Sequence, residues 1–254
     1  MSNKKLKLIS VAAVLLCVIS AIGWIAADNK LKALESEETV LAELPAPEVT
    51  DGARGELGID KNINEETIDN YLGREDAVYR DMRMLKDEGD YESLGGDSYL
   101  SGYVEGFEVV PYPYLVNVVG LPESVGTPYS GKTLFTQEDG VYTANYEESM
   151  AFLEYWFPKD KIIFLMCGGG GYAGMTKAML VALGWDESKI YDVGGYWYYE
   201  GSHNVEVKRT TDSGATVYDF FKVSYHAPDV NTMTAIKTTT SETTSETTSE
   251  TTEE

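Results

Sequence analysis

Residues 161–185 read KIIFLMCGGGGYAGMTKAMLVALGW, and this stretch decides the fold class. After Lys161 the run to Met166 is continuously apolar, which is typical of a central parallel strand covered on both faces. Apolar side chains recur at helical spacing over residues 173–184 and predict a helix. Between strand and helix stand one cysteine, four glycines and a tyrosine. The stretch therefore predicts a strand, a loop and a helix, with a thiol at the carboxyl end of a buried strand.

Similar signals flank this stretch on both sides. Short apolar runs bounded by turn residues predict three further strands, and apolar residues at helical spacing predict a second helix. Asp139-Gly140 predicts the turn of a β-hairpin. These elements cover residues 77–81, 107–110 and 190–193 (strands), 133–146 (hairpin) and 150–157 (helix). Strands that alternate with helices predict an α/β domain with a mainly parallel central sheet.

The loop after the apolar run has the strongest chemical signal in the chain. Four successive glycines lack Cβ atoms and permit positive φ, so the backbone can turn several N–H groups inward, and the next helix adds its positive dipole end. These donors predict a stabilised thiolate, the nucleophilic form of cysteine. The alternative is a small cysteine that is merely packed before a glycine-rich turn. The candidate site residues are Cys167, Gly168, Gly169, Gly170, Gly171 and Tyr172.

Four landmarks, in order along the chain, resemble the rhodanese family of sulfurtransferases. That family has a loop cysteine, a glycine three residues later, and a glycine–aromatic pair at the end of the following helix. The matching residues are Cys167, Gly170, Gly184 and Trp185, with Asp81-Met82-Arg83, Gly102–Phe107 and Gly194–Trp197 as the other three landmarks. The resemblance covers about residues 62–201. It implies a rhodanese-like three-layer domain with a hairpin insertion at about residues 115–146.

The resemblance also implies a reaction. Cys167 would take sulfur from a small donor, carry it as a persulfide and pass it to a thiol or cyanide acceptor, with no cofactor. Asp81 and Arg83 would brace the fold beside the site or contact the substrate, and Tyr172 would donate a hydrogen bond or wall the pocket. The loop departs from the family because it lacks a cation to hold an anionic donor. The candidate cations outside it are Arg80, Arg83, Lys86 and Lys132.

The glycines of the loop allow a second interpretation. Gly169, Gly171 and Gly174 have the spacing of a dinucleotide-binding fingerprint, and Asp192 stands at a later strand end where an acidic residue would bind a ribose. Against it, few strands follow the motif to build a nucleotide-binding sheet. It also leaves the landmarks upstream of the loop without an explanation.

Single residues argue against two other kinds of site, that of a cysteine phosphatase and a metal site. A cysteine phosphatase needs an arginine six residues after the cysteine, where Ala173 stands. His203 and His226 are isolated, so the sequence predicts no metal site. The remaining alternative is a non-catalytic binding module of the rhodanese fold, which would tolerate the loss of Cys167.

The two ends of the chain differ from a folded domain. Residues 8–27 are apolar, uncharged and preceded by lysines, which predicts a signal anchor or a cleaved signal peptide within residues 1–27. In either case the positive-inside rule places the rest outside the cytoplasm, membrane-anchored through residues 8–27 or secreted. The other predicted segments are an acidic tether (28–61), the domain (62–201), an appended hairpin (202–237) and a disordered Ser/Thr/Glu tail (238–254).

The charge of the chain limits the partners that it can bind, and its cysteine content limits the disulfides that it can form. The net charge is −22, and because residues 1–27 hold three lysines and no acid, the rest of the chain carries −25. Such a surface repels phosphate backbones, so nucleic acid is not an expected partner. The chain has two cysteines, and Cys17 lies in the apolar segment. The domain is therefore expected to contain one thiol and no internal disulfide.

Overall fold

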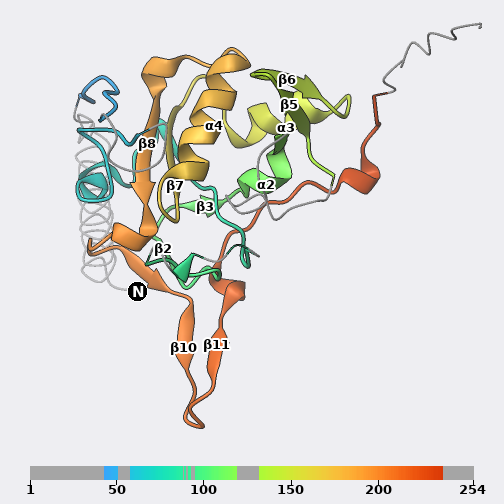
Figure 1. The fold of residues 1–254 in the computed structure, drawn as a ribbon. Helices are drawn as coiled ribbons and strands as arrows, with labels where there is room; N and C mark the ends of the chain where they lie inside the picture. The colour runs from blue at the N-terminus through green and yellow to red at the C-terminus, as the bar shows by residue number, and fades with distance from the viewer. Residues whose placement is uncertain are drawn as a thin grey trace, which may run out of the picture. The chain divides into compact units, whose positions relative to one another are not determined.

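Four parallel strands form the central sheet, in the order β3-β1-β7-β8 (Figure 1). Their bounds are Ala77–Asp81 (β1), Glu108–Val109 (β3), Ile162–Cys167 (β7) and Ile190–Gly195 (β8). The computed structural model describes residues 43–50, 58–87, 89, 91, 92, 95–118 and 132–236. Contacts divide the chain after residue 44, and the central sheet belongs to the unit that begins at Pro45. The predicted α/β class with a mainly parallel sheet is confirmed.

One face of the sheet packs against three helices. They are α2 (Tyr112–Leu115), α3 (Ser149–Trp156) and α4 (Gly171–Ala182). Alternate residues of β7, namely Ile163, Leu165 and Cys167, belong to one core cluster with side chains of all three helices. Because side chains alternate along a strand, this face of β7 is wholly apolar apart from the thiol. Cys167 is therefore built into the main core.

The other face carries a row of aromatic side chains. Tyr79 of β1 stacks on Phe164 of β7, which in turn contacts Tyr191 of β8. The hydroxyl of Tyr79 donates to the carbonyl of Tyr71 in the 3₁₀ helix η1 (Ile68–Tyr71). The hydroxyl of Tyr191 donates to the carbonyl of Pro45. The segment before β1 thus closes this face.

The boundary predicted between tether and domain, at residue 62, is therefore placed too late. Ile59 and Asp60 are buried, and the Asp60 N–H donates to the carbonyl of Asp192 in β8. The Asp60 carboxylate also accepts the backbone N–H groups of residues 48, 62 and 63. The polar composition of this segment concealed its packing, because its buried groups are mainly backbone amides and one carboxylate that pair with each other.

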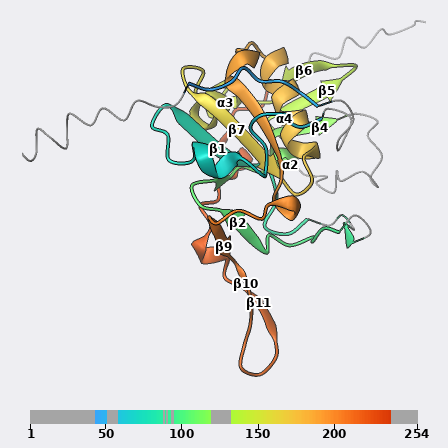
Figure 2. The same cartoon turned by 90° about the vertical axis from the view of Figure 1, so that its left-hand side faces the viewer.

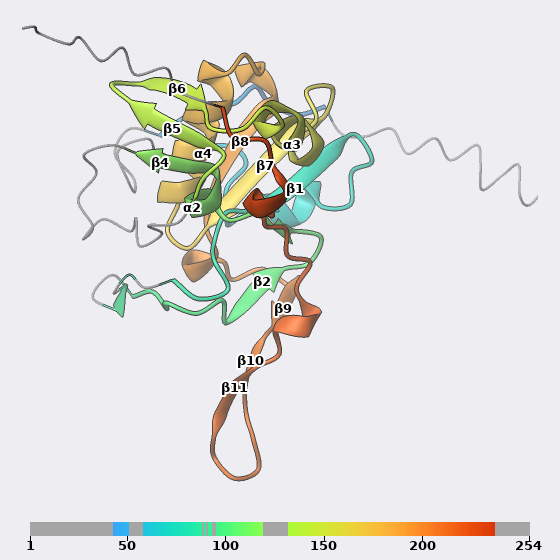
Figure 3. The same ribbon diagram turned by 90° about the vertical axis from the view of Figure 1, so that its right-hand side faces the viewer.

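A second sheet accounts for the predicted insertion. It contains β4 (Val116–Val118), β5 (Phe135–Glu138) and β6 (Val141–Ala144), grouped on one side in Figure 3. The hairpin between β5 and β6 turns at Asp139 and Gly140, which both have positive φ, as a tight two-residue hairpin turn requires. The predicted hairpin is confirmed.

The C-terminal region is more than an appended hairpin. Strand β9 (Asn204–Glu206) pairs with β2 (Gly102–Val104), and β10 (Lys208–Thr210) with β11 (Thr216–Tyr218) forms a hairpin that projects from the rest (Figures 1 and 2). The chain then returns to the domain through bridges at Tyr225 and Ala235. The other short helices are η4 (Glu187–Lys189), η5 (Tyr196–Tyr198), η6 (Phe220–Lys222) and η7 (Val230–Thr232).

Three predicted segments fall wholly or partly beyond this description. The apolar segment 8–27 and the tail 238–254 lie outside the described residues, as do residues 28–42 and 51–57 of the tether. Within the part of the chain that the structure describes, no helix is long and apolar enough to cross a membrane.

Candidate functional site

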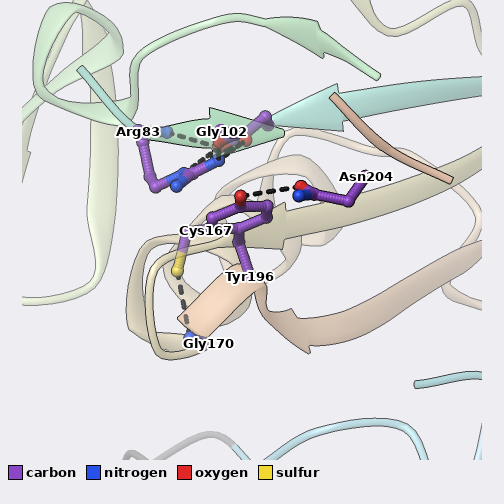
Figure 4. Close-up of polar contacts among 7 residues, drawn as sticks. Arg83, Gly102, Cys167, Gly170, Tyr196 and Asn204 are labelled. Atoms are coloured by element: carbon purple, nitrogen blue, oxygen red, sulfur yellow. Dashed lines mark hydrogen bonds and ion pairs between the residues drawn. The ribbon is translucent and has the colours of Figure 1, made fainter. Parts of the chain in front are cut away.

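Cys167 is the last residue of β7 and lies at the edge where the parallel strands end. Its Sγ accepts the backbone N–H of Gly170 at 3.1 Å (Figure 4). Gly170 has φ of +105°, a conformation that side chains disfavour, and α4 begins at the next residue. The loop therefore turns a backbone donor onto the sulfur, as the glycine run predicted.

Burial dominates the titration of this thiol. Cys167 is 2% exposed, and burial raises its pKa to about 11. The N–H groups of Ala173 and Gly170 lower the pKa, while the nearby carboxylates of Asp192 and Asp81 raise it. The expectation of a stabilised thiolate is thus corrected: the donors act in the expected direction, but loss of water around the sulfur outweighs them.

The other loop residues take different positions. Gly168 and Gly170 are buried, Gly169 is partly buried, and Gly171 is exposed at the start of α4. A Cβ atom on Gly168 would lie 2.4 Å from the indole ring of Trp197. The glycine run therefore serves two purposes, since one glycine turns the backbone and another admits a large ring against it.

Asp81 and Arg83 form a buried ion pair beside Cys167. Arg83 Nε donates to Asp81 Oδ1 at 2.9 Å, its Nη2 donates to Oδ2, and Nη2 also donates to the carbonyl of Gly102 at 2.8 Å. The guanidinium lies over the ring of Tyr196, 4.3 Å from its centroid (Figure 4). This arrangement braces β1, β2 and η5 at the edge where the thiol lies.

Arg83 also has an unused donor. Its Nη1 is buried and has no hydrogen-bond partner among the described residues. Of the other candidate cations, Arg80 pairs with Glu108 and donates to the carbonyl of Trp156, Lys86 lies over the ring of Tyr99, and Lys132 is exposed. Among the four cations, Arg83 is thus the one whose ion-pair partner interacts with the Cys167 thiol.

Tyr172 belongs to a buried polar cluster that sequence reasoning missed. Its hydroxyl donates to Asp87 Oδ2 at 3.1 Å, and Tyr91 donates to the same oxygen at 3.0 Å. Burial raises the pKa of both tyrosines, and the Cys167 sulfur adds to the rise at Tyr91. Asp87 lies in a loop with no motif around it, so no local signal could identify it. Tyr172 therefore faces this carboxylate and stacks on Tyr112.

Trp197 lies against the glycine loop. Its backbone N–H donates to the carbonyl of Gly168, and a Cβ on either Gly168 or Gly96 would meet its ring at less than 3 Å. Tyr91 packs on the same ring, with centroids 5.3 Å apart. The indole Nε1 is buried without a hydrogen-bond partner among the described residues. The Trp197 side chain thus packs between the cysteine loop and the loop that contains Gly96.

A surface pocket of about 830 Å³ is lined in part by residues of η5. Tyr196 and Trp197 line it, together with residues of the 92–101 loop and of β9 and β10. The same two aromatic residues therefore contribute to the pocket wall and to the packing around the cysteine loop.

The geometry gives no support to the dinucleotide-binding interpretation of the glycine loop. The Asp192 carboxylate is buried and accepts the N–H of Gly194, so it is not placed to bind a ribose. Within the described residues, no three His, Cys, Asp or Glu side chains are arranged to hold a metal ion.

The fold and site together define a class: an α/β protein with one buried cysteine at the carboxyl edge of a parallel sheet, against a glycine loop and a helix N-terminus. Comparisons with models of known protein families, with curated proteins and with solved structures find no match for this chain. The assignment of function therefore rests on the chemistry of the site.

Proposed function

We propose that this chain is a rhodanese-like sulfurtransferase that carries sulfur on Cys167. The observation that carries the proposal is the position of the sulfur, at the carboxyl end of a central parallel strand with the Gly170 N–H donated to it at 3.1 Å. Ligands of open parallel sheets bind at that edge. A backbone donor aimed at the sulfur stabilises the negative charge that both a thiolate and a persulfide bear.

The proposed reaction has two steps. The Cys167 thiol gives its proton to solvent, and the thiolate attacks the outer sulfur of a donor such as thiosulfate. The S–S bond of the donor breaks and sulfite leaves with the electron pair, so Cys167 becomes a persulfide. A thiolate or cyanide acceptor then attacks the outer sulfur, and the electron pair of the broken S–S bond returns to Cys167.

Arg83 is the proposed contact for an anionic donor. Two of its nitrogens are used by Asp81 and Gly102, which fixes the guanidinium plane, while Nη1 has no partner among the described residues. A fixed, buried cation with an unused donor is suited to a sulfonate or carboxylate oxygen. It would supply the charge that the loop itself lacks.

A non-catalytic binding module is the second candidate, and a specific observation favours it. The thiol is 2% exposed and its pKa is raised to about 11, so at neutral pH it is protonated and covered. The sulfurtransferase proposal therefore requires the packing around the cysteine loop, including Trp197, to open when the donor binds.

We further propose that residues 8–27 hold the domain outside the cytoplasm.

Intact-mass analysis tests the reaction directly. The full chain with Cys17→Ser, which leaves Cys167 as its single thiol, is incubated separately with thiosulfate and with mercaptopyruvate. We expect a gain of about 32 Da, one sulfur atom, that dithiothreitol removes. The matched control, Cys17→Ser with Cys167→Ser, should gain nothing.

Arg83→Met separates the proposed roles of the site. It should reduce persulfide formation from the anionic donors without changing the rate at which a neutral agent alkylates Cys167. If the Cys17→Ser chain gains no sulfur from either donor at any pH up to about 11, the binding module replaces the sulfurtransferase.

A further inference from the structure

Two buried nitrogen donors have no hydrogen-bond partner among the described residues, and both belong to side chains that pack around the cysteine loop. They are Nη1 of Arg83 and Nε1 of Trp197. The Arg83 side chain is 8% exposed, so its charge is held away from water. A buried donor that makes no hydrogen bond destabilises the fold, most of all when it is charged. Such a group calls for an explanation by strain, by catalysis or by a bound water or ion.

The indole of Trp197 lies over the residue that follows Cys167. A Cβ atom on Gly168 would lie 2.4 Å from Cζ2 of the ring and 2.6 Å from Cε2. Because Cε2 is bonded to Nε1, the indole N–H belongs to the edge of the ring that meets Gly168. The backbone N–H of Trp197 donates to the carbonyl of Gly168 and holds the residue in this position. The unused indole donor is therefore close to the carboxyl end of β7, where the sulfur lies.

Arg83 reaches the same part of the site from the end of β1. Its ion-pair partner, Asp81, lies near enough to the Cys167 thiol to raise its pKa. The guanidinium stacks on Tyr196, which directly precedes Trp197 in η5 (Figure 4). The two unused donors thus belong to side chains that are held together by one short helix beside Cys167.

The chemistry of these donors selects the kind of ligand. Neither a guanidinium nor an indole has an acceptor, so both can bind only a group with lone pairs, and the charge of Arg83 favours an anion. A sulfonate or a carboxylate offers oxygens to both donors. The chain after residue 27 carries −25 and repels an anion at long range, but salt screens that repulsion far more than it screens a buried contact. Binding of an oxyanion therefore depends on direct contact with these two donors.

We propose that Trp197 is a substrate-binding residue, whose indole N–H acts with Arg83 Nη1 to hold the oxyanion of the sulfur donor beside Cys167. This inference rests on the proposed sulfur transfer and adds a residue that binds the leaving group. Trp197 also lines the surface pocket, which gives its ring space to move when the oxyanion enters.

The two donors would act as the bond to the transferred sulfur breaks. From thiosulfate, the electron pair of the S–S bond leaves with sulfite. From mercaptopyruvate, the electron pair of the C–S bond goes to carbon as an enolate, which takes a proton from solvent and leaves as pyruvate. In both cases negative charge grows on the leaving group, and fixed donors in contact with it stabilise that charge.

NMR of the indole N–H groups tests the contact without the reaction. The full chain with Cys17→Ser, with nitrogen-15 in its four tryptophans, is titrated with sulfite and separately with pyruvate. Neither compound can deliver sulfur. We expect one indole signal, identified by its absence in Trp197→Phe, to shift saturably. Trp185 is the internal control, because its Nε1 already donates to the carbonyl of Phe157 at 2.7 Å and its signal should not move.

The two titrations also identify the class of donor. A shift with sulfite supports a sulfonate-type donor such as thiosulfate, and a shift with pyruvate supports a carboxylate donor such as mercaptopyruvate. Arg83→Met should abolish the shift, and an unchanged Trp185 signal shows that this variant is folded. No saturable shift with either compound, an equal shift of Trp185, or a full shift in folded Arg83→Met would overturn the proposal.

Trp197→Phe provides a second measurement, since it keeps an aromatic ring and removes the N–H. We expect it to lower kcat/KM for persulfide formation about tenfold to hundredfold, as for the loss of one hydrogen bond to a charged group. The rate at which neutral iodoacetamide alkylates Cys167 should not fall. An equal change in both rates would overturn the proposal, because the indole would then act only by covering the thiol.

Failure of this inference can be told apart from failure of the proposed function. If sulfite or pyruvate shifts the Trp197 signal but Cys167 never gains sulfur, the oxyanion site stands and the sulfurtransferase falls. If Cys167 gains sulfur and the Trp197 signal does not move, only the role of Trp197 is refuted.

Discussion

The reactivity of Cys167 is the sharpest test of the site. Burial raises the pKa of the thiol from an ordinary value of 9.0 to about 11, although Gly170 donates an N–H to the sulfur. This difference lowers the thiolate fraction at neutral pH about 100-fold. Because the thiolate is the species that alkylates, the folded chain should react about 100-fold more slowly than the unfolded chain.

The assay uses the Cys17→Ser chain, in which Cys167 is the single thiol. The rate at which iodoacetamide alkylates Cys167 is measured by intact mass over a series of pH values. The folded chain and the chain unfolded in urea are compared. Below the pKa the rate should increase tenfold for each pH unit, and the folded chain should reach its plateau near pH 11. A plateau of the folded chain at or below about pH 8.5 would refute the reasoning, because the donors would then outweigh burial.

The same titration affects stability. A raised pKa means that the folded state disfavours the thiolate, so this contribution is fully present below about pH 9 and is lost as the pH rises through about 11. Its full size is about 3 kcal/mol. Over this pH range the urea midpoint of the Cys17→Ser chain should therefore fall by more than the midpoint of the chain with both Cys17→Ser and Cys167→Ser. The difference between the two chains isolates the contribution of the thiol from that of tyrosines that ionise over the same pH range.

Three further predictions concern the packing of the site. Asp81→Ala leaves the buried Arg83 guanidinium without its ion-pair partner and should destabilise the fold by about 3–5 kcal/mol, measured by urea unfolding. Tyr172→Phe removes the hydroxyl that donates to the buried Asp87 and should cost about 1–3 kcal/mol, with Tyr155→Phe, an exposed position, as control. Gly168→Ala places a Cβ 2.4 Å from the Trp197 ring, so it should displace the indole, change its fluorescence and speed alkylation of Cys167; an unchanged alkylation rate would show that Trp197 does not cover the thiol.

Elements with a strong local signal could be predicted from the sequence. The apolar run of β7 and the helical spacing of α4 are properties of neighbouring residues, so the α/β class followed from them. The hairpin turn at Asp139 and Gly140 is equally local, since positive φ suits these two residue types. The position of Cys167 at the sheet edge followed from the order of strand, cysteine and glycines.

The environment of the thiol could not be predicted in the same way. Asp87 and Tyr91 come from a loop with no motif, and Trp197 comes from η5, so their side chains meet near the cysteine loop only after the chain has folded. Their distances in sequence carry no information about their distances in space. The composition of the segment with Ile59 and Asp60 likewise predicts a tether, because its polar groups find their partners in distant parts of the chain.

By itself the sequence determined the class of the fold and the residue proposed to carry the chemistry, because secondary structure and the glycine loop depend on local pattern. The tertiary structure decided the state of that residue. The pKa of Cys167 is a balance between donors that the loop supplies and water that the surrounding side chains exclude. Only the packing of distant elements against the thiol determines how much water is lost, and here that loss outweighs the donors.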